Sequence, residues 1–488
     1  MASNVIISKT KIEKPKTDNM KWLPLILIES YLILTLLIYQ FGLFKWDTQN
    51  TFKFWIYIIL YHIAFIAGYI WIARKSANCE NIYANNIIKK INPIFGALLL
   101  LYVIYVVILY KNTTGYDYSN ITSLFSEVAK ALENPGKQYY EANERLKTYG
   151  GQKIITAVSG IFSVFFYSLI PLATYWWDRL SKVYKALFYA IILLNVSVNV
   201  SVGKNSGIFI MLFYFMSSFL LVVVIKGKEQ IKTRKSFIFF IGLLCIFSFW
   251  FFSRGMETRI GSVVTDANIR NEIQLAEIQA NQAQTDKTQS NQNVPSKETE
   301  RSDIAKIAPE KRYTNLNMPL SAENLFYGVD NYLTNGYFMF SLALSEPVEW
   351  CYGLGSSDFL RSNARSVLGI NVSSKMLESK LTEKYSGLNY FSSIYTSLAN
   401  DLHFVGIIVF MLLAGMLTAY IWRDAYFNKN TVAYLLLPLL AIFYLYFPVG
   451  NILGNNITMF FAFFELLFLY IGAKYLIKKR IREEDRND

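Results

Sequence analysis

The sequence predicts an all-α polytopic membrane protein with about ten transmembrane helices and a large extracytoplasmic loop between helices 7 and 8. Composition is the first reason: of 488 residues, 53% are hydrophobic and only 17% are charged, which is too apolar for an average globular domain. The second reason is about ten apolar runs near the roughly 20 residues that a helix needs to cross the hydrocarbon core. Such runs become helices because lipid offers no partner for an unpaired backbone amide.

The predicted spans follow one another along the whole chain. They lie at roughly 22–44, 54–73, 93–110, 154–175, 186–202, 207–225, 237–253, 402–422, 432–449 and 457–476. Only the short turn from Gly203 to Gly207 separates the fifth span from the sixth. Merging these two spans would reverse the orientation of every later helix.

Basic residues in the short loops predict the orientation, because cytoplasmic loops carry an excess of Lys and Arg. With the N-terminus placed inside, the inner segments hold 24 of these residues, and the short outer turns hold only Lys45, Lys53 and Lys204. Both termini are therefore predicted to be cytoplasmic. The net charge of +13 follows from this distribution, so it does not indicate nucleic-acid binding. Residues 1–21 form a basic cytoplasmic segment before an uncleaved signal anchor, and 477–488 form a basic tail.

Few residues are available for metal or haem chemistry. The chain has three cysteines and two histidines, and the predicted topology puts Cys79 inside, Cys245 in a span and Cys351 outside. No two cysteines share a compartment, so no disulfide is expected. A site built from His and Cys ligands also has too few residues, so no metal and no cofactor is predicted.

Two regions outside the membrane are longer than turns. Within residues 22–253, which hold the first seven spans, the outer loop 111–153 contains an amphipathic stretch at 123–132 that predicts an interfacial helix. The large loop covers 254–401, before the last three spans in 402–476. Its part 269–315 is polar and poor in aromatic residues, which predicts disorder. The part from 320 to 398 is expected to fold as short helices along the outer face of the bundle.

Charged and polar residues at the outer boundary are the first candidates for chemistry, because charges are costly in lipid and useful beside a polar headgroup. Arg254 and Arg259 directly follow the seventh span, and Lys204 lies in an outer turn close to Asn199. The guanidinium fork matches phosphate oxygens, so these cations are candidate diphosphate ligands. Two structural interpretations remain open: the arginines reach lipid phosphates, and the polar residues near Asn199 pack between helices.

A second group of candidates lies in the large loop and at its end. Arg361 and Arg365 are four residues apart and share one helix face, and Asp358 is one turn earlier and able to pair with them. At the end of the loop, Asp401 and His403 stand at the outer start of the eighth span. A histidine is suited to act as a general base near neutral pH, whereas an aspartate there is also a typical helix cap.

Ionisable residues also lie inside the predicted spans. Glu29, His62 and Glu465 occur singly along the sequence, one in each of the first, second and tenth spans. Such residues are candidates for a proton path in a transporter. Internal hydrogen bonding is the interpretation that their scattered positions favour.

Three short segments resemble the oligosaccharide repeat-unit polymerase (Wzy) family of bacterial polysaccharide assembly. They are Tyr332–Leu344, Tyr352–Gly355 and Ile394–Gly406, the last of which runs into an apolar span. The predicted topology is also similar to that of this family. The family usually has an aromatic residue and a glycine after the aspartate at the mouth of that span, and here Leu402 and His403 stand in those places. His403 resembles instead the catalytic-loop histidine of the related O-antigen ligases.

The resemblance implies a bundle like that of the GT-C-like polymerases and ligases, located in the bacterial cytoplasmic (inner) membrane. It implies a metal-independent glycosyltransferase that polymerises undecaprenyl-diphosphate-linked repeat units into O-antigen or capsular polysaccharide on the outer face. Arg254, Arg259 and Lys204 would bind the diphosphate, and Arg361 and Arg365 would bind diphosphate or sugar.

The remaining site residues are also assigned from the resemblance. Asp401 or His403 would orient or deprotonate the acceptor hydroxyl, and Asn199 and Tyr337 would contact the substrate. The expected partners are the lipid-linked glycan as donor and acceptor, membrane lipids, and a chain-length regulator and flippase of the same pathway. No nucleic acid is expected.

Other functions remain open. An O-antigen ligase would use the same donor and fold with a different acceptor. A polyprenyl-phosphate-sugar glycosyltransferase is disfavoured, because the loop 45–53 offers only Asp47 to a metal. A flippase or transporter of lipid-linked oligosaccharide would hold charged residues near the midplane and would not need a long outer loop. A scaffold role is not excluded by any residue.

Overall fold

The computed structural model describes residues 18–75, 91–117, 122–149, 153–258, 310–312, 320–385 and 392–487. Nine helices in this part of the chain are long and apolar enough to cross a membrane, which confirms the predicted helical, multi-span fold. These candidate spans are Asn19–Phe41, Thr51–Ala73, Ile91–Ile108, Ala157–Arg179, Lys182–Ser201, Asn205–Lys226, Lys235–Thr258, Ile394–Tyr426 and Ile457–Leu476. The remaining predicted span, 432–449, is the shorter apolar helix α17, Thr431–Leu445.

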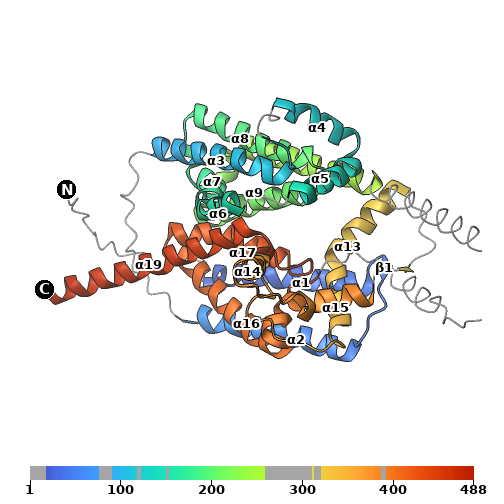
Figure 1. Ribbon diagram of the computed structural model, residues 1–488. Helices are drawn as coiled ribbons and strands as arrows, with labels where there is room; N and C mark the ends of the chain where they lie inside the picture. Colours follow the sequence, from blue (N-terminus) through green and yellow to red (C-terminus); the bar gives the residue numbers. More distant parts are fainter. Residues whose placement is uncertain are drawn as a thin grey trace, which may run out of the picture.

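The helices form two groups (Figure 1). One contains α3 (Ile91–Thr114), α4 (Leu124–Glu133), α5 (Pro135–Tyr149), α6 (Lys153–Ile161), α7 (Ser163–Trp176), α8 (Lys182–Ser201) and α9 (Asn205–Lys226). The other contains α1 (Leu23–Phe41), α2 (Thr51–Ala73), α13 (Leu320–Ala343), α14 (Asp358–Leu368), α15 (Leu377–Lys384) and α16 (Ile394–Tyr426). Between the groups, α17 packs on α9 and α16, and α19 (Ile457–Asn487) packs on α7 and α17.

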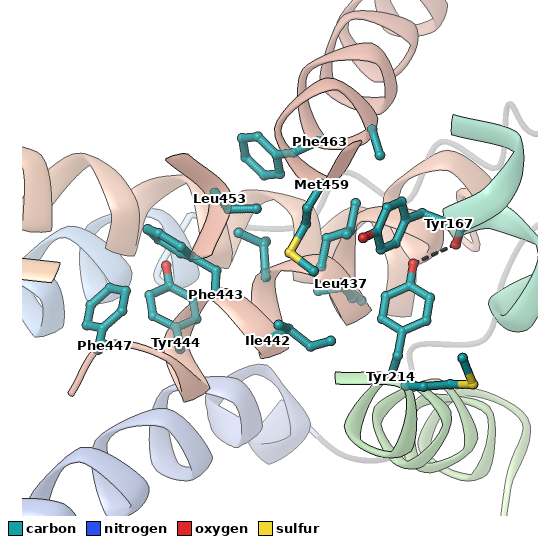
Figure 2. Close-up of a cluster of buried hydrophobic side chains, with 14 of the residues drawn as sticks. Tyr167, Tyr214, Leu437, Ile442, Phe443, Tyr444, Phe447, Leu453, Met459 and Phe463 are labelled. Atoms are coloured by element: carbon teal, nitrogen blue, oxygen red, sulfur yellow. Dashed lines mark hydrogen bonds between the residues drawn. The ribbon is translucent and has the colours of Figure 1, made fainter. Parts of the chain in front are cut away.

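The interface between the two groups is a buried cluster of aromatic and aliphatic side chains. Figure 2 shows Leu437 and Ile442 of α17 beside Met459 of α19, with Tyr167 of α7 and Tyr214 of α9 next to them. All five side chains are buried. The Tyr214 hydroxyl donates a hydrogen bond to the Tyr167 carbonyl oxygen at 2.5 Å, so α7 and α9 are joined by a polar contact within the apolar cluster.

The segments predicted to be cytoplasmic meet at one end of the molecule. The Trp422 indole donates to the Met20 carbonyl at 3.0 Å, and the Tyr69 hydroxyl donates to the Lys21 carbonyl at 2.7 Å. Arg234 pairs with Asp178, and Lys429 donates to the Ile225 carbonyl. We call this the basic end, and the opposite end, which carries residues 320–385, the loop end.

The large loop differs from the expected short helices on the outer face. Its first described helix, α13, has 24 residues, and the run from Tyr337 to Leu344 is buried. The Trp46 indole donates to the Thr334 hydroxyl at 2.8 Å. At Gly336 a Cβ atom would lie 1.9 Å from the Pro448 carbonyl oxygen, so only glycine permits this approach. The apolar second half of α13 therefore inserts into the bundle.

Two further sequence predictions have different outcomes. The amphipathic helix predicted at 123–132 is α4, which packs against α8. The polar stretch 269–315 lies outside the described residues except for 310–312, as do residues 1–17 and Cys79. Glu310–Lys311 (β2) pairs in antiparallel fashion with Phe44–Lys45 (β1), and this places the far end of the stretch beside the end of α1.

Candidate functional site

Asp401 is held by a tight backbone loop at the loop end of α16. This helix begins at Ile394, eight residues before the predicted start of the span. The Asp401 carboxylate accepts hydrogen bonds from the Gly355 amide at 3.0 Å, the Ser356 amide at 2.8 Å and the Ser356 hydroxyl at 2.7 Å. Three donors to one carboxylate fix its position and orientation. The loop and the helix are therefore joined at this point.

The other side of the same loop is fixed as well. The Asn451 amide donates to the Ser356 carbonyl at 2.7 Å. At Gly454 a Cβ atom would lie 1.9 Å from that carbonyl oxygen, so the two backbones are in contact. Arg361 donates from Nη1 to the Gly355 carbonyl at 3.2 Å. Arg361 and Asp401, both predicted from sequence, therefore converge on the same short loop.

The two arginines of α14 differ in their surroundings. The guanidinium of Arg361 also pairs with Asp358, the alternative that the sequence left open. Arg365 is exposed at the end of the helix. Beside it, Val367 and Leu368 are 76% and 68% exposed. The end of α14 therefore presents a cation next to apolar surface, a combination suited to the membrane interface.

His403 interrupts α16 two residues after Asp401. Its backbone has φ 59° and ψ 161°, a region that residues other than glycine rarely adopt, at a cost on the order of 1–3 kcal/mol. The side chain is exposed. The break separates a short helix at 394–402 from the apolar span that starts at Phe404. An exposed imidazole at the mouth of a span is free to accept a proton from a ligand.

Lys204 and Arg254 flank a second polar site, at the start of α9. Lys204 is the N-cap residue of this helix, and Asn205 is its first residue. At Gly255 a Cβ atom would lie 3.0 Å from Nδ2 of the Asn205 side chain, so Gly255 and Asn205 are in contact. Arg254 and Lys204 directly precede these two residues in the sequence. Asn205 is 5% exposed, and neither polar atom of its side chain has a hydrogen-bond partner among the described residues.

The electrostatics of this second site favour an anion. A helix N-terminus carries free amide donors and a partial positive charge. Burial lowers the pKa of the Lys204 ammonium, so a bound anion would stabilise a charge that now lacks full hydration. Arg254 is half exposed and forms a surface ion pair with Glu257 at 3.3 Å. Such a pair contributes little stability and leaves the guanidinium available to a ligand.

The other predicted site residues lie elsewhere. Arg259 is outside the described residues. Asn199 lines an internal cavity between helices. Tyr337 is fully buried, with its hydroxyl 2.8 Å from that of Thr35. The prediction that Tyr337 contacts substrate does not fit this position, because the aromatic ring belongs to the packed second half of α13.

The sequence did not reveal two groups that the structure brings together. Glu29 Oε2 lies 2.6 Å from His62 Nδ1, and both residues are buried. Their single positions in two different spans gave no sign of this pairing. A carboxyl and an imidazole that share one proton form a neutral pair, which hydrocarbon tolerates far better than a single charge. The other group is Ser356 with Asp401. The sequence did not indicate this pair, because a serine in a glycine-rich loop has no specific meaning.

No family model, curated protein or solved structure matches this sequence or this fold. A functional hypothesis must therefore rest on the chemistry of the loop end.

Proposed function

We propose that this protein is a polysaccharide polymerase that joins undecaprenyl-diphosphate-linked repeat units at the outer face of the bacterial inner membrane. The observation that carries the proposal is the pair of polar sites at one end of a membrane bundle. The site at Lys204, Asn205 and Arg254 suits a diphosphate. The site at Asp401, His403 and Arg361 suits a sugar hydroxyl. In this reading the loop end faces outward, and the O-antigen or capsule pathway supplies the substrate.

The reaction assigns a distinct task to each site. An acceptor hydroxyl oxygen attacks the anomeric carbon of the donor glycan, and the bond from that carbon to the diphosphate oxygen breaks. The hydroxyl proton passes to a base, for which the exposed imidazole of His403 is the better candidate, since three donors already occupy Asp401. Negative charge grows on the leaving diphosphate. The amides at the start of α9, Lys204 and Arg254 would stabilise that charge.

Asp401 has a positioning role in this mechanism. Its hydrogen bonds hold residues 355 and 356 against α16, and Arg361 approaches the same loop through the Gly355 carbonyl. The loop would present Arg361 to the donor sugar or diphosphate. The resemblance to repeat-unit polymerases implies the same use of arginines in the outer loop.

Complementation of a deletion strain tests the proposal. The gene is deleted in its host and restored as wild type, Lys204→Ala or Lys53→Ala at matched membrane expression, and the surface glycan is separated on a gel. Lys53 is exposed at the same end, so it is a charge-matched control. We expect single repeat units in the deletion strain, a full ladder with wild type and with Lys53→Ala, and a loss on the order of 100- to 1,000-fold in polymer with Lys204→Ala.

The alternative outcomes point to specific errors. A normal ladder in the deletion strain would exclude polymerisation. A normal ladder in the strain with Lys204→Ala would be compatible with polymerisation. It would contradict the assignment of Lys204 to diphosphate binding. If the deletion strain attaches no glycan and accumulates long lipid-linked polymer, the protein is an O-antigen ligase. The exposed His403 favours this second candidate, because it resembles the catalytic-loop histidine of ligases.

The buried pair of Glu29 and His62 gives little support to the flippase alternative. A carrier that couples to protons needs a group that gains and loses net charge. The pairing of Glu29 with His62 at 2.6 Å instead gives each of these buried groups a partner of opposite charge type within the bundle. We therefore rank this function below the two transferases.

A further inference from the structure

A cavity lies beside the second polar site, where the Lys204 amide donates to the Asn199 carbonyl at 3.1 Å. It has a volume of about 190 Å³, is partly open, and is lined by α3, α7, α8, α9 and the start of α19. Nine of its sixteen lining residues carry a hydroxyl or an amide: four tyrosines, three asparagines and two threonines. No Asp, Glu, Lys, Arg or His is among the described residues that line it. The lining is therefore polar and uncharged.

The polar residues of the cavity gather towards the loop end. Thr113 is the last residue but one of α3, Asn199 is near the end of α8, and Asn456 directly precedes α19. Tyr102 and Tyr214 lie deeper along their helices. Amide groups within membrane helices are costly unless they have hydrogen-bond partners, so three asparagines around one space make it a polar site within an apolar bundle.

Hydrogen bonds inside the lining leave specific groups free. The Asn199 amide nitrogen donates to Asn195 Oδ1 at 3.0 Å, and the Asn195 amide nitrogen donates to the Tyr102 hydroxyl oxygen at 3.1 Å. The Tyr102 proton is then available to a further acceptor. Asn456 accepts through Oδ1 from Thr458. In the described part of the chain, Asn199 Oδ1 and the Asn456 amide nitrogen have no hydrogen-bond partner, so the cavity offers both donors and an acceptor.

Aromatic rings form the wall between these polar groups. The Phe166 ring stacks on Tyr102 with centroids 4.5 Å apart, and it lies 4.3 Å from the ring of Tyr105. The volume of about 190 Å³ is far above the roughly 10–15 Å³ that a single water requires, so the cavity has room for a group larger than a few waters. Flat aromatic surface suits the apolar face of a sugar, and mixed donors and acceptors suit its hydroxyls, each of which both donates and accepts.

We propose that the cavity between α3, α7, α8, α9 and α19 is a binding site for one uncharged, hydroxyl-bearing sugar ring. The ligand has no charge because no cation or anion lines the site. This inference goes beyond the transfer reaction, since a ligase or a carrier of lipid-linked glycan would also need a sugar site. It stands on the cavity alone and does not require the diphosphate site at Lys204.

Saturation-transfer NMR on the whole protein tests the inference. The protein is placed in lipid nanodiscs free of sugar-headgroup detergent and is probed with the methyl glycosides of glucose, galactose, mannose and N-acetylglucosamine. The variants are Asn199→Leu, which keeps the side-chain volume and removes the free acceptor, and Tyr102→Phe, which removes the free donor. Ser197→Leu is the matched control, because Ser197 is half-buried on the same helix, does not line the cavity, and donates to the Leu193 carbonyl.

We expect at least one glycoside to bind to wild type and to Ser197→Leu, and to bind about tenfold more weakly to either cavity variant. The proposal would be overturned if none of the four glycosides showed a saturation-transfer signal with wild type. Equal saturation-transfer signals for Tyr102→Phe and wild type would overturn it as well. Tyr102→Phe decides the outcome if Asn199→Leu fails to fold. The glycan ladder of the same variants in cells separates this question from the proposed function. If a cavity variant loses sugar binding but gives a normal ladder, the cavity binds sugar and is not required for glycan transfer.

Discussion

At the scale of single residues, His403 at the loop end has an unfavourable backbone conformation. Its backbone φ of 59° and ψ of 161° belong to a region used almost only by glycine. Glycine at this position would remove the strain, but it would also remove the imidazole. Residue 403 therefore combines a strained backbone with an exposed imidazole. This gives a way to separate the backbone role of residue 403 from its chemical role.

We predict that His403→Gly raises the melting temperature and abolishes glycan transfer. The gain in stability follows from relief of strain on the order of 1–3 kcal/mol. The loss of activity follows if the imidazole takes the acceptor proton, which typically contributes on the order of 100- to 10,000-fold in rate. Thermal unfolding in detergent and the glycan ladder are measured on the same preparation. A stable variant with a normal ladder would assign His403 to the backbone break only.

A buried carboxyl in α13 provides a second residue-scale prediction. Asp330 is 6% exposed, and burial raises the pKa of its carboxyl to about 6. The folded protein thus holds this proton more tightly than the unfolded chain does. The contribution of Asp330 to stability is fully present at low pH and is lost as the pH rises through about 6.

Asp330→Asn should remove this dependence, because asparagine keeps the shape without the charge. We expect the variant to melt at a higher temperature than wild type at pH 8 and at about the same temperature at pH 3.5, below the ordinary pKa of the carboxyl. Asp47→Asn is the control, since Asp47 is an exposed carboxylate at the same end. If Asp330→Asn instead melts lower at pH 8, the carboxylate is stabilised by Arg312, whose charge acts to lower its pKa.

At the scale of elements, glycine permits a close contact between α2 and α16. At Gly68 of α2 a Cβ atom would lie 2.0 Å from the Leu412 carbonyl oxygen of α16. At Gly415 of α16 it would lie 2.1 Å from the Phe65 carbonyl oxygen of α2. Small residues let membrane helices approach until their backbones touch. The two glycines therefore seat α16, which carries Asp401 at its loop end, against α2.

Gly415→Ala should force α2 and α16 apart and destabilise the protein by about 1–3 kcal/mol, because the obstructing atom is backbone and cannot turn away. Gly472→Ala is the matched control in α19, where a Cβ atom would meet nothing within 4 Å. There alanine is expected to be neutral or to stabilise the helix by up to about 1 kcal/mol. Melting curves in detergent compare the two variants. Equal melting temperatures would mean that the α2–α16 contact is not tight.

Element positions were largely predictable from sequence, because apolar length alone defines a spanning helix. The fifth and sixth spans, which were predicted on either side of the short turn near Gly203, are indeed the two helices α8 and α9. The insertion of α13 was not predictable, since its first half is polar and its second half resembles any apolar stretch. The start of α16 at Ile394 was missed because Ser397 and Asn400 look like loop residues, although Asn400 is buried and accepts from the Leu377 amide at 2.8 Å.

Site geometry was less predictable than the elements. Sequence spacing placed Arg361 near Asp358, but the convergence of Arg361 and Asp401 on Gly355 depends on a contact across 46 residues. The unpartnered amide of Asn205 beside Gly255 depends on how the seventh span meets α9. Such contacts are products of packing, and a single sequence contains no periodicity that reports them.

At the scale of the whole molecule, the arrangement of charge predicts the orientation in the membrane. The segments that meet at the basic end are those with the excess of Lys and Arg, and the candidate sites are at the opposite end. If the positive-inside rule governs this chain, residue 366 in α14 is extracellular or periplasmic, and residue 228 between α9 and α10 (Glu229–Thr233) is cytoplasmic. Both native residues, Ser366 and Lys228, are exposed.

Single-cysteine labelling tests this orientation. In a background where Cys79, Cys245 and Cys351 are replaced by serine, Ser366→Cys should react with a membrane-impermeant maleimide from the outer side of the membrane, and Lys228→Cys should react only after the membrane is opened. In the wild type, Cys351 should stay unlabelled at the outer side although it belongs to the same loop. It is fully buried, and burial, followed by the nearby Asp401 and Glu378 charges, raises the pKa of its thiol to about 11, so the reactive thiolate is scarce. Labelling of Lys228→Cys from outside would reverse the bundle and place the two polar sites in the cytoplasm, where outward-facing glycan transfer is impossible.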